Sequence, residues 1–194
     1  DEDRPVHVGF GEAVGAGVEF GVLVFVPHAE RVEIGDQVAA DPVGADDHQR
    51  ADRIEDGLPG LLVRDGDALF GGLGKPEVYL CGSHYLSGFL NEKPLAQLRS
   101  DLAELGLGRD ETMPETEDHV SYVFEVMRFL IAGDDVSVSN LTQQQKFFAA
   151  HVLPWLPRLC ETLAGHPSAR FYAALAGFTQ AFIGVEAQGF DMLD

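Results

Sequence analysis

The stretch VSYVFEVMRFLI, residues 120–131, decides the fold class. Its apolar side chains recur at intervals of three and four residues, which is the spacing of one face of an amphipathic helix. We expect the segment from Glu115 to His119 to begin this helix and Gly133 to end it. The apolar positions are Val120, Val123, Phe124, Met127, Leu130 and Ile131.

The segment upstream, from Pro94 to Gly106, has the same spacing. Its leucines recur at steps of three and four residues, and Gly106 is a typical stop signal for a helix. A loop from Gly106 to Pro114 would separate the two helices, and no strand is predicted after Pro94. The leucines are Leu95, Leu98, Leu102 and Leu105.

Further helices are predicted between residue 140 and the C-terminus. Asn140 or Thr142 can cap the first of them, and Pro154 and Pro157 are expected to bend or break it. Ser168 is expected to cap the last helix. The predicted class is an all-α helical bundle, whose helices must cover one another's apolar faces. The apolar residues of these segments include Phe147, Phe148, Val152, Trp155, Leu156, Leu159, Cys160, Leu163, Phe171, Tyr172, Leu175, Phe178, Phe182, Ile183 and Val185.

The N-terminal third has a different composition. Residues 1–72 contain no Ser, Thr, Asn, Lys, Tyr, Cys, Met or Trp and hold 12 of the 22 Gly. We therefore divide the chain into an atypical Gly/Asp-rich segment, residues 1–66, and a helical domain, residues 67–194. The first is predicted to be irregular or weakly β, with strand-like patterns over residues 18–26 and 30–34. Two hypotheses explain its composition: a wrong reading frame of a GC-rich gene, or a genuine disordered acidic extension.

Charge and composition restrict the classes of partner. The formal net charge is −19, so the surface field repels nucleic acid and anionic membranes and favours basic partners. Two cysteines make neither a disulfide framework nor a four-thiolate metal site. No apolar run is long enough to span a membrane, and no secretory signal is visible. We expect a cytoplasmic protein with reduced thiols and no stable membrane association. Because the chain starts without Met, the sequence is also compatible with a fragment.

Motifs for enzymatic chemistry are weak. The glycines at 9, 11 and 15 lack the strand and the helix that a dinucleotide loop needs. Glu115 and His119 stand four residues apart, so on one helical turn they could bind a metal or transfer protons. Catalysis would need a third group, and no motif supplies one. A metal- or nucleotide-dependent helical enzyme that uses His119 stays an alternative hypothesis, and we predict no metal, no cofactor and no catalytic residue.

Four segments together resemble a known family. They are residues 67–95, which begin DALFGGLGKPEVYLCGSHYLSGF, residues 115–130, residues 145–155 and residues 171–186. Their residue types and order are similar to those of the TorD/DmsD-type redox-enzyme maturation chaperones. The family signature is Glu-x-Pro-Asp-His at a helix start. Glu115, Asp118 and His119 match it, whereas Glu117 stands where proline is usual.

The resemblance implies a non-enzymatic, cytoplasmic, all-α molecular chaperone. Such proteins bind the twin-arginine signal peptide, or the apo-form of a molybdoenzyme such as formate dehydrogenase, and assist cofactor insertion before export. The implied peptide-binding residues are Tyr85, Glu115, Asp118, His119 and Tyr122. Carboxylates can meet guanidinium groups in charge-assisted pairs, and an aromatic groove can receive the apolar part of the peptide.

One departure from the family affects stability. Family members normally begin with several helices before the segment that starts at Asp67, and residues 1–66 show no such pattern. Apolar faces would then be partly uncovered, which predicts aggregation or a homodimer. A truncated helical scaffold without activity is the remaining alternative.

Overall fold

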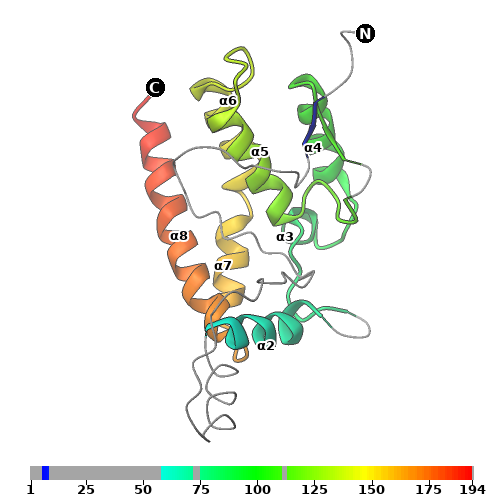
Figure 1. The fold of residues 1–194 in the computed structure, drawn as a ribbon, viewed down its shortest axis with the longest axis vertical. Coiled ribbons are helices and arrows are strands. Elements are labelled where there is room, and N and C mark those ends of the chain that lie inside the picture. Colours follow the sequence, from blue (N-terminus) through cyan, green and yellow to red (C-terminus); the bar gives the residue numbers. More distant parts are fainter. Residues whose placement is uncertain (1–5, 9–57, 72–74, 111–112, 194) are drawn as a thin grey trace, which may run out of the picture.

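The computed structural model describes residues 6–8, 58–71, 75–110 and 113–193 (Figure 1). The chain is mainly helical, which confirms the predicted class. The elements are β1 (Val6–Val8), α2 (Leu58–Phe70), α3 (Gly82–Ser87), α4 (Lys93–Glu104), β2 (Leu107–Arg109), α5 (Val120–Ala132), α6 (Leu141–Phe147), the π-helix η1 (Phe148–Val152), α7 (Leu156–Ala164) and α8 (Arg170–Asp191).

Helix α4 follows the predicted leucine spacing. Leu95, Leu98 and Leu102 are each only 2% exposed, so this face enters the core. Pro94 lies in the first turn, where its missing N–H costs no hydrogen bond. Gly106 follows the helix with a positive φ of 69°, a conformation that glycine adopts without strain.

Helix α5 begins later than the sequence predicted. It starts at Val120, with His119 as its N-cap, so Glu115 to Asp118 form the loop that leads into it. Glu115 and His119 therefore do not share a helical turn, and the predicted first turn is wrong. The buried face is also rotated from the prediction: Val126 is fully buried, whereas Ile131 is 61% exposed.

Prolines interrupt the helical path as expected. Asn140 caps α6, since its side chain accepts a hydrogen bond from the N–H of Gln143. Helix α6 continues into the π-helix η1, and the chain breaks at Pro154 before α7 begins. Pro157 lies in the first turn of α7. The break turns Trp155 inward, where it is 2% exposed.

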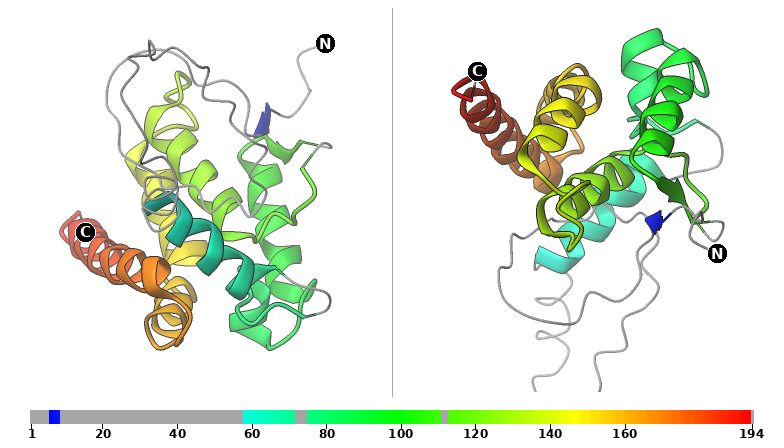
Figure 2. Two further views of the ribbon diagram at one scale, coloured as in Figure 1. Left: turned by 60° about the horizontal axis from the view of Figure 1, so that its bottom comes forward. Right: turned by 90° about the horizontal axis from the view of Figure 1, so that it is seen from above.

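Helix α8 is the longest element and forms one edge of the molecule (Figures 1 and 2). It packs against α7 and α2, and its buried residues are Tyr172, Ala176, Ile183 and Phe190. Ala169, not Ser168, is its N-cap, so the predicted cap is wrong. Phe178 and Phe182, which we expected in the core, are exposed because they lie on the face away from α7.

The helical region begins before Asp67. Helix α2 starts at Leu58, so residues 58–66 are helical and not irregular or β as the sequence suggested. Leu69 of this helix is fully buried, and Asp65 accepts a hydrogen bond from the backbone N–H of Phe171 in α8 at 2.6 Å. These contacts hold α2 on the bundle. The predicted division of the chain at residue 66 stays a prediction, but the helical region begins at least as early as Leu58.

Two three-residue strands add a small sheet. β1 pairs in parallel with β2, Val6 opposite Leu107. β2 is a strand where none was predicted, because three residues are too few to leave a periodic signal. The strand-like patterns at residues 18–26 and 30–34 lie outside the described residues. Among the helices that the structure describes, none has the length and apolar character to cross a bilayer.

Candidate functional site

Backbone hydrogen bonds join α3 to the loop before α5. The N–H of Gly82 donates to the carbonyl of Asp118 at 2.8 Å, and the N–H of Val120 donates to the carbonyl of Leu80 at 2.9 Å. Cys81 and His119 form an isolated antiparallel bridge between these two contacts. We call residues 80–83 with 116–121 the α3–α5 junction. It brings together two of the four segments that carry the family resemblance.

The carboxylate of Asp118 is enclosed in this junction. Its Oδ2 accepts hydrogen bonds from the N–H of Ser83 at 2.8 Å and from the Ser83 hydroxyl at 2.5 Å. Its Oδ1 accepts from the hydroxyl of Thr116 at 2.6 Å. Asp118 is only 4% exposed. Both oxygens are therefore engaged inside the protein, and this arrangement opposes the predicted direct contact with a guanidinium group.

His119 is also turned inward, with 5% of its surface exposed. Its Nδ1 lies 2.6 Å from the Ser121 hydroxyl and accepts from the N–H of Ser121, which caps α5. Burial lowers the pKa of His119, against the opposite influence of the Glu115 and Asp118 carboxylates. A neutral imidazole is the form that can accept this capping bond.

Glu117 connects the loop before α5 to α4 and β2 through salt bridges. Its Oε2 accepts hydrogen bonds from Nε and Nη2 of Arg99 in α4, at 2.9 and 2.8 Å. Its Oε1 lies 3.7 Å from Nε of Arg109, whose Nη1 donates to the carbonyl of Met113. A salt bridge therefore stands at the one position where the chain departs from the signature described above. The sequence identified the departure but not the partner, which lies 18 residues away.

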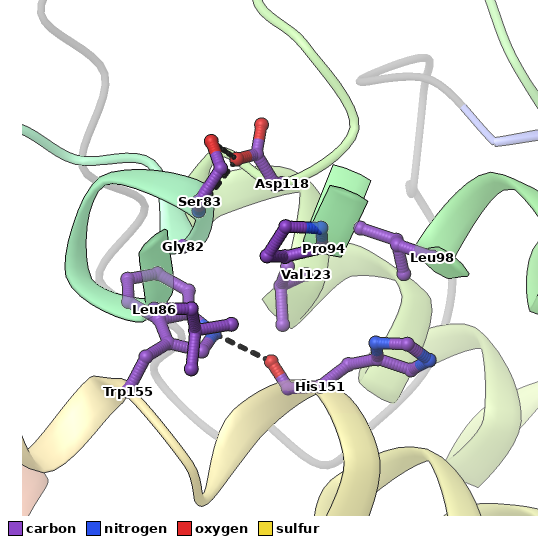
Figure 3. A pocket seen from close by; sticks show the side chains of 9 residues that line it. All are labelled: Gly82, Ser83, Leu86, Pro94, Leu98, Asp118, Val123, His151 and Trp155. Carbon is purple, nitrogen blue, oxygen red and sulfur yellow. Dashed lines mark hydrogen bonds between the residues drawn. The ribbon is translucent and has the colours of Figure 1, made fainter. Parts of the chain in front are cut away.

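A small recess lies beside the junction, and Figure 3 shows its lining. The recess is shallow and open on one side, and the space not filled by atoms in it and in front of it is about 230 Å³. Its floor holds Trp155, whose indole N–H donates to the carbonyl of His151 at 2.6 Å. Gly82 leaves room for the indole, since a Cβ there would come within 3.0 Å of it. The lining residues are Gly82, Ser83, Leu86, Pro94, Leu98, Asp118, Val123, His151 and Trp155.

Exposed apolar side chains continue from the recess along the turn between α3 and α4. Leu86 lines the recess and is 42% exposed, while Phe89 is 69% and Leu90 is 43% exposed. The turn is held by Gly88, with φ of 82°, and Asn91, with φ of 56°. The sequence analysis did not single out Phe89 and Leu90. Their position between Gly88 and Asn91, two residues typical of turns, could have indicated an exposed apolar turn.

Acidic side chains near the recess remain partly open to solvent. Asp101 Oδ2 lies 2.6 Å from Nε2 of His151, and the Asp101 side chain is 31% exposed. Glu115, in the loop before α5, is half-buried. These two carboxylates, unlike that of Asp118, can be reached from solvent. Asp101 was missed because it lies between the core leucines of α4.

The two tyrosines predicted in the site are both turned inward. The Tyr85 hydroxyl donates to the carbonyl of Tyr79 at 2.8 Å, and its ring stacks on Trp155 with centroids 5.9 Å apart. Tyr122 has no exposed surface, and within the described part of the chain its hydroxyl has no hydrogen-bond partner. Burial raises the pKa of each phenol to about 12. Tyr85 adjoins the recess through Trp155, whereas Tyr122 lies in the core.

Metal-binding geometry is not found in the part of the chain that the structure describes. No three His, Cys, Asp or Glu side chains there approach closely enough to share an ion. Burial raises the pKa of both Cys81 and Cys160 to about 11, so both are protonated thiols at neutral pH. The site is therefore an enclosed polar junction beside an apolar recess.

Comparison with known proteins places the chain in a family. A family model described as nitrate reductase delta subunit matches residues 48–161, which is more than half of the chain. The chain belongs to this family. The TorD-type resemblance is confirmed, and the match starts at residue 48 instead of near residue 67. It includes the α3–α5 junction and the recess and stops before α8.

The curated relatives are named as chaperones of the TorD type. The chaperone protein TorD of Vibrio cholerae serotype O1 is 30% identical over 102 residues, covering 50% of this chain and 46% of that protein. TorD of Aliivibrio fischeri is 27% identical over 108 residues, covering 53% and 50%. The chain spans about half the length of the curated relatives it matches. No solved structure matches the chain significantly.

Proposed function

We propose that this protein is a non-enzymatic chaperone of redox-enzyme maturation that binds a twin-arginine signal peptide or the apo-form of its client. The client would be a molybdoenzyme, with formate dehydrogenase as one candidate, retained in the cytoplasm until its cofactor is inserted. Family membership and the chaperone names of the TorD relatives support the general role. The proposal includes a homodimer, because apolar residues of α8 are exposed.

The recess with its exposed apolar rim is the observation that carries peptide binding. Signal peptides combine a cationic head with an apolar segment, and such a segment is favoured by exposed hydrophobic surface. Leu86 presents that surface in the recess that Trp155 also lines, and Phe89 and Leu90 follow it on the turn to α4. Single exposed apolar residues are common in proteins, but here three of them occur within five residues of one turn that starts at the recess.

Charge complements this apolar surface. Asp101 and Glu115 are partly exposed carboxylates on elements that border the recess. Glu115 is the stronger candidate to pair with arginine, because Asp101 already accepts from Gln97 at Oδ1 and lies 2.6 Å from His151 at Oδ2. Arginine is preferred over lysine in such pairs because its planar fork donates two parallel hydrogen bonds. Asp118 and His119 then act by fixing the loop that carries Glu115, and not by touching the peptide.

Peptide titration tests the proposal. A fluorescent signal peptide with two arginines is titrated against the full chain, next to the same peptide with two lysines. We expect a dissociation constant in the micromolar range or below for the first peptide and clearly weaker binding for the second. Equal affinity for both, or no binding to either, would reject the proposed recognition.

A surface variant locates the binding site. Phe89→Ser removes a side chain that is 69% exposed on the rim, and Val136→Ser removes one that is 79% exposed before α6. Only the first change should weaken binding, by about 10-fold or more, as expected for an anchor in an apolar contact. If both variants bind like the unmodified protein, the peptide does not use this recess.

A further inference from the structure

The outer face of α8 is apolar and uncovered by the residues that the structure describes. Phe178 and Val185 are each 66% exposed, Phe182 is 41% exposed, and Met192, just after the helix, is 81% exposed. The opposite face of the same helix is buried against α7 and α2. A helix that is apolar all round is typically buried on every side. The outer face therefore has no partner among the residues that the structure describes.

The spacing on this face is that of a helix-pairing seam. Large and small residues alternate at steps of three and four, which is the pattern of the inner positions in a coiled coil. The large set is Phe171, Phe178, Val185 and Met192, and the small or polar set is Ala174, Ala181 and Gln188. Phe171, at the start of the set, is half-buried against the core, whereas the other large residues are exposed. We call these seven residues the α8 seam. Over residues 171–192 it is roughly 30 Å long.

We propose that two copies of this chain associate through an antiparallel pair of α8 helices. In that orientation the two central large residues of the seam each face an alanine of the other copy: Phe178 meets Ala181, and Val185 meets Ala174, while Phe171 meets Gln188. Facing large and small side chains fill space evenly. A parallel pair would instead set Phe178 against Phe178 and leave Ala181 facing Ala181 across a gap.

Charge complementarity selects the same partner and orientation. No charged residue occurs between Arg170 and Glu186, although the chain as a whole carries −19. The two charges beside the seam are Arg170 and Asp191, both exposed, at its opposite ends and in equivalent positions three heptads apart. Antiparallel pairing brings Arg170 of each copy next to Asp191 of the other, whereas parallel pairing would bring like charges together.

Glycines beside the seam allow close approach. Gly177 and Gly184 flank it at the same heptad position, and a Cβ built on either would meet no atom within 4 Å. This side of the helix is therefore open, and backbones can approach closely where side chains are absent. The pairing specifies the homodimer of the proposed function and rests on that part of it, but it is independent of peptide binding, because the seam and the recess are formed by different residues.

Sedimentation velocity of the full chain across a range of concentrations tests the pairing. We expect a concentration-dependent shift from monomer to dimer. Ala181→Glu puts a charge at the centre of the seam and should raise the dissociation constant about 10-fold or more. Gln180→Glu introduces a glutamate on a side of α8 away from the seam and should change the dissociation constant by no more than about twofold. A chain that stays monomeric throughout, or a dimer that tolerates Ala181→Glu, overturns the proposal.

Charge reversal tests the orientation. Arg170→Asp and Asp191→Arg should each weaken the dimer, because each creates two like-charge contacts across the pair. The double variant restores opposite charges and should recover the original dissociation constant within about twofold. Losses that add in the double variant instead of cancelling would show that the helices do not run antiparallel through this face. Circular dichroism confirms that each variant keeps its helix content.

Discussion

The α3–α5 junction and the outer face of α8 are opposites in composition and environment. The junction encloses polar groups: Asp118, His119 and Ser83 are each at most 5% exposed, with Asp118 hydrogen-bonded to Ser83 and His119 to Ser121. The outer face of α8 exposes apolar groups, with Phe178 and Val185 each 66% exposed. One region has polar residues where a core is expected, and the other has apolar residues where a surface is expected.

The difference separates two kinds of functional residue. Buried polar groups that satisfy one another fix a backbone, and their removal is costly to the fold. Exposed apolar groups contribute little to the monomer and are available to a partner. The junction lies within the residues that match the family, and the whole of α8 follows them. We infer that the junction supports the shared fold, while the face of α8 serves association of this chain.

The largest expected contrast is between two phenylalanines. Phe148 is 5% exposed, and the centroid of its ring lies 5.1 Å from that of Phe190. Phe148→Ala should therefore lower the free energy of unfolding by about 3–5 kcal/mol. Phe178→Ala should change it by less than about 0.5 kcal/mol in the monomer. Urea unfolding at a concentration below the dimer range measures both.

A large loss from Phe178→Ala in the monomer would break the comparison. It would mean that this ring already packs inside one chain, so that the seam is not free to receive a second copy. A small loss of monomer stability, combined with a weaker dimer at high concentration, would support the assignment of the outer face of α8 to association.

The next contrast concerns carboxylates. Asp118→Ala removes the acceptor of the Ser83 N–H and hydroxyl, and it should lower the free energy of unfolding by about 3 kcal/mol. Asp134→Ala, on the exposed segment after α5, should stay within about 0.5 kcal/mol. Thermal and urea unfolding compare the two. If Asp118→Ala unfolds like Asp134→Ala but loses peptide binding, Asp118 contacts the peptide directly and our assignment of it to the scaffold is wrong.

Two tyrosines give effects of opposite sign. Tyr122→Phe removes a buried hydroxyl without a described partner and should raise the free energy of unfolding by about 1 kcal/mol. Tyr85→Phe removes a hydroxyl that donates to Tyr79 and should lower it by about 1 kcal/mol. Urea unfolding of both variants checks the signs. A loss for Tyr122→Phe as large as that for Tyr85→Phe would reveal a partner for the Tyr122 hydroxyl.

Sequence patterns predicted the helices because apolar spacing is a local property. The leucines of α4, the Asn140 cap of α6 and the proline break before α7 all lie where the pattern indicated. Ser168 was misassigned as a cap because a capping residue is recognised only relative to a helix start, and starts are the least certain feature of a pattern.

Burial and pairing could not be predicted in the same way. The apolar residues of α8 encircle the helix, and a sequence does not say which side another helix covers, so Phe178 and Phe182 were placed in the core. Similarly, Asp118 was expected at the surface because carboxylates are seldom buried unless they are paired. Its partner, Ser83, lies 35 residues away, and only the folded chain brings the two together.

The smallest predicted effect is a pH dependence that originates in His119. Burial lowers its pKa in the folded protein below the ordinary value of 6.5, so the unfolded chain binds more protons in the interval between the two values. The contribution of His119 to stability is therefore complete above about pH 6.5 and decreases as the pH falls below it. Urea unfolding between about pH 7.5 and pH 5.5 measures this loss.

A variant separates this loss from pH effects that arise elsewhere in the chain. His119→Asn keeps an acceptor for the N–H of Ser121 but does not titrate. The unmodified protein should lose more stability on acidification than His119→Asn does. If both lose the same amount, His119 is accessible to solvent protons without cost, and the junction is less enclosed than its 5% exposure indicates.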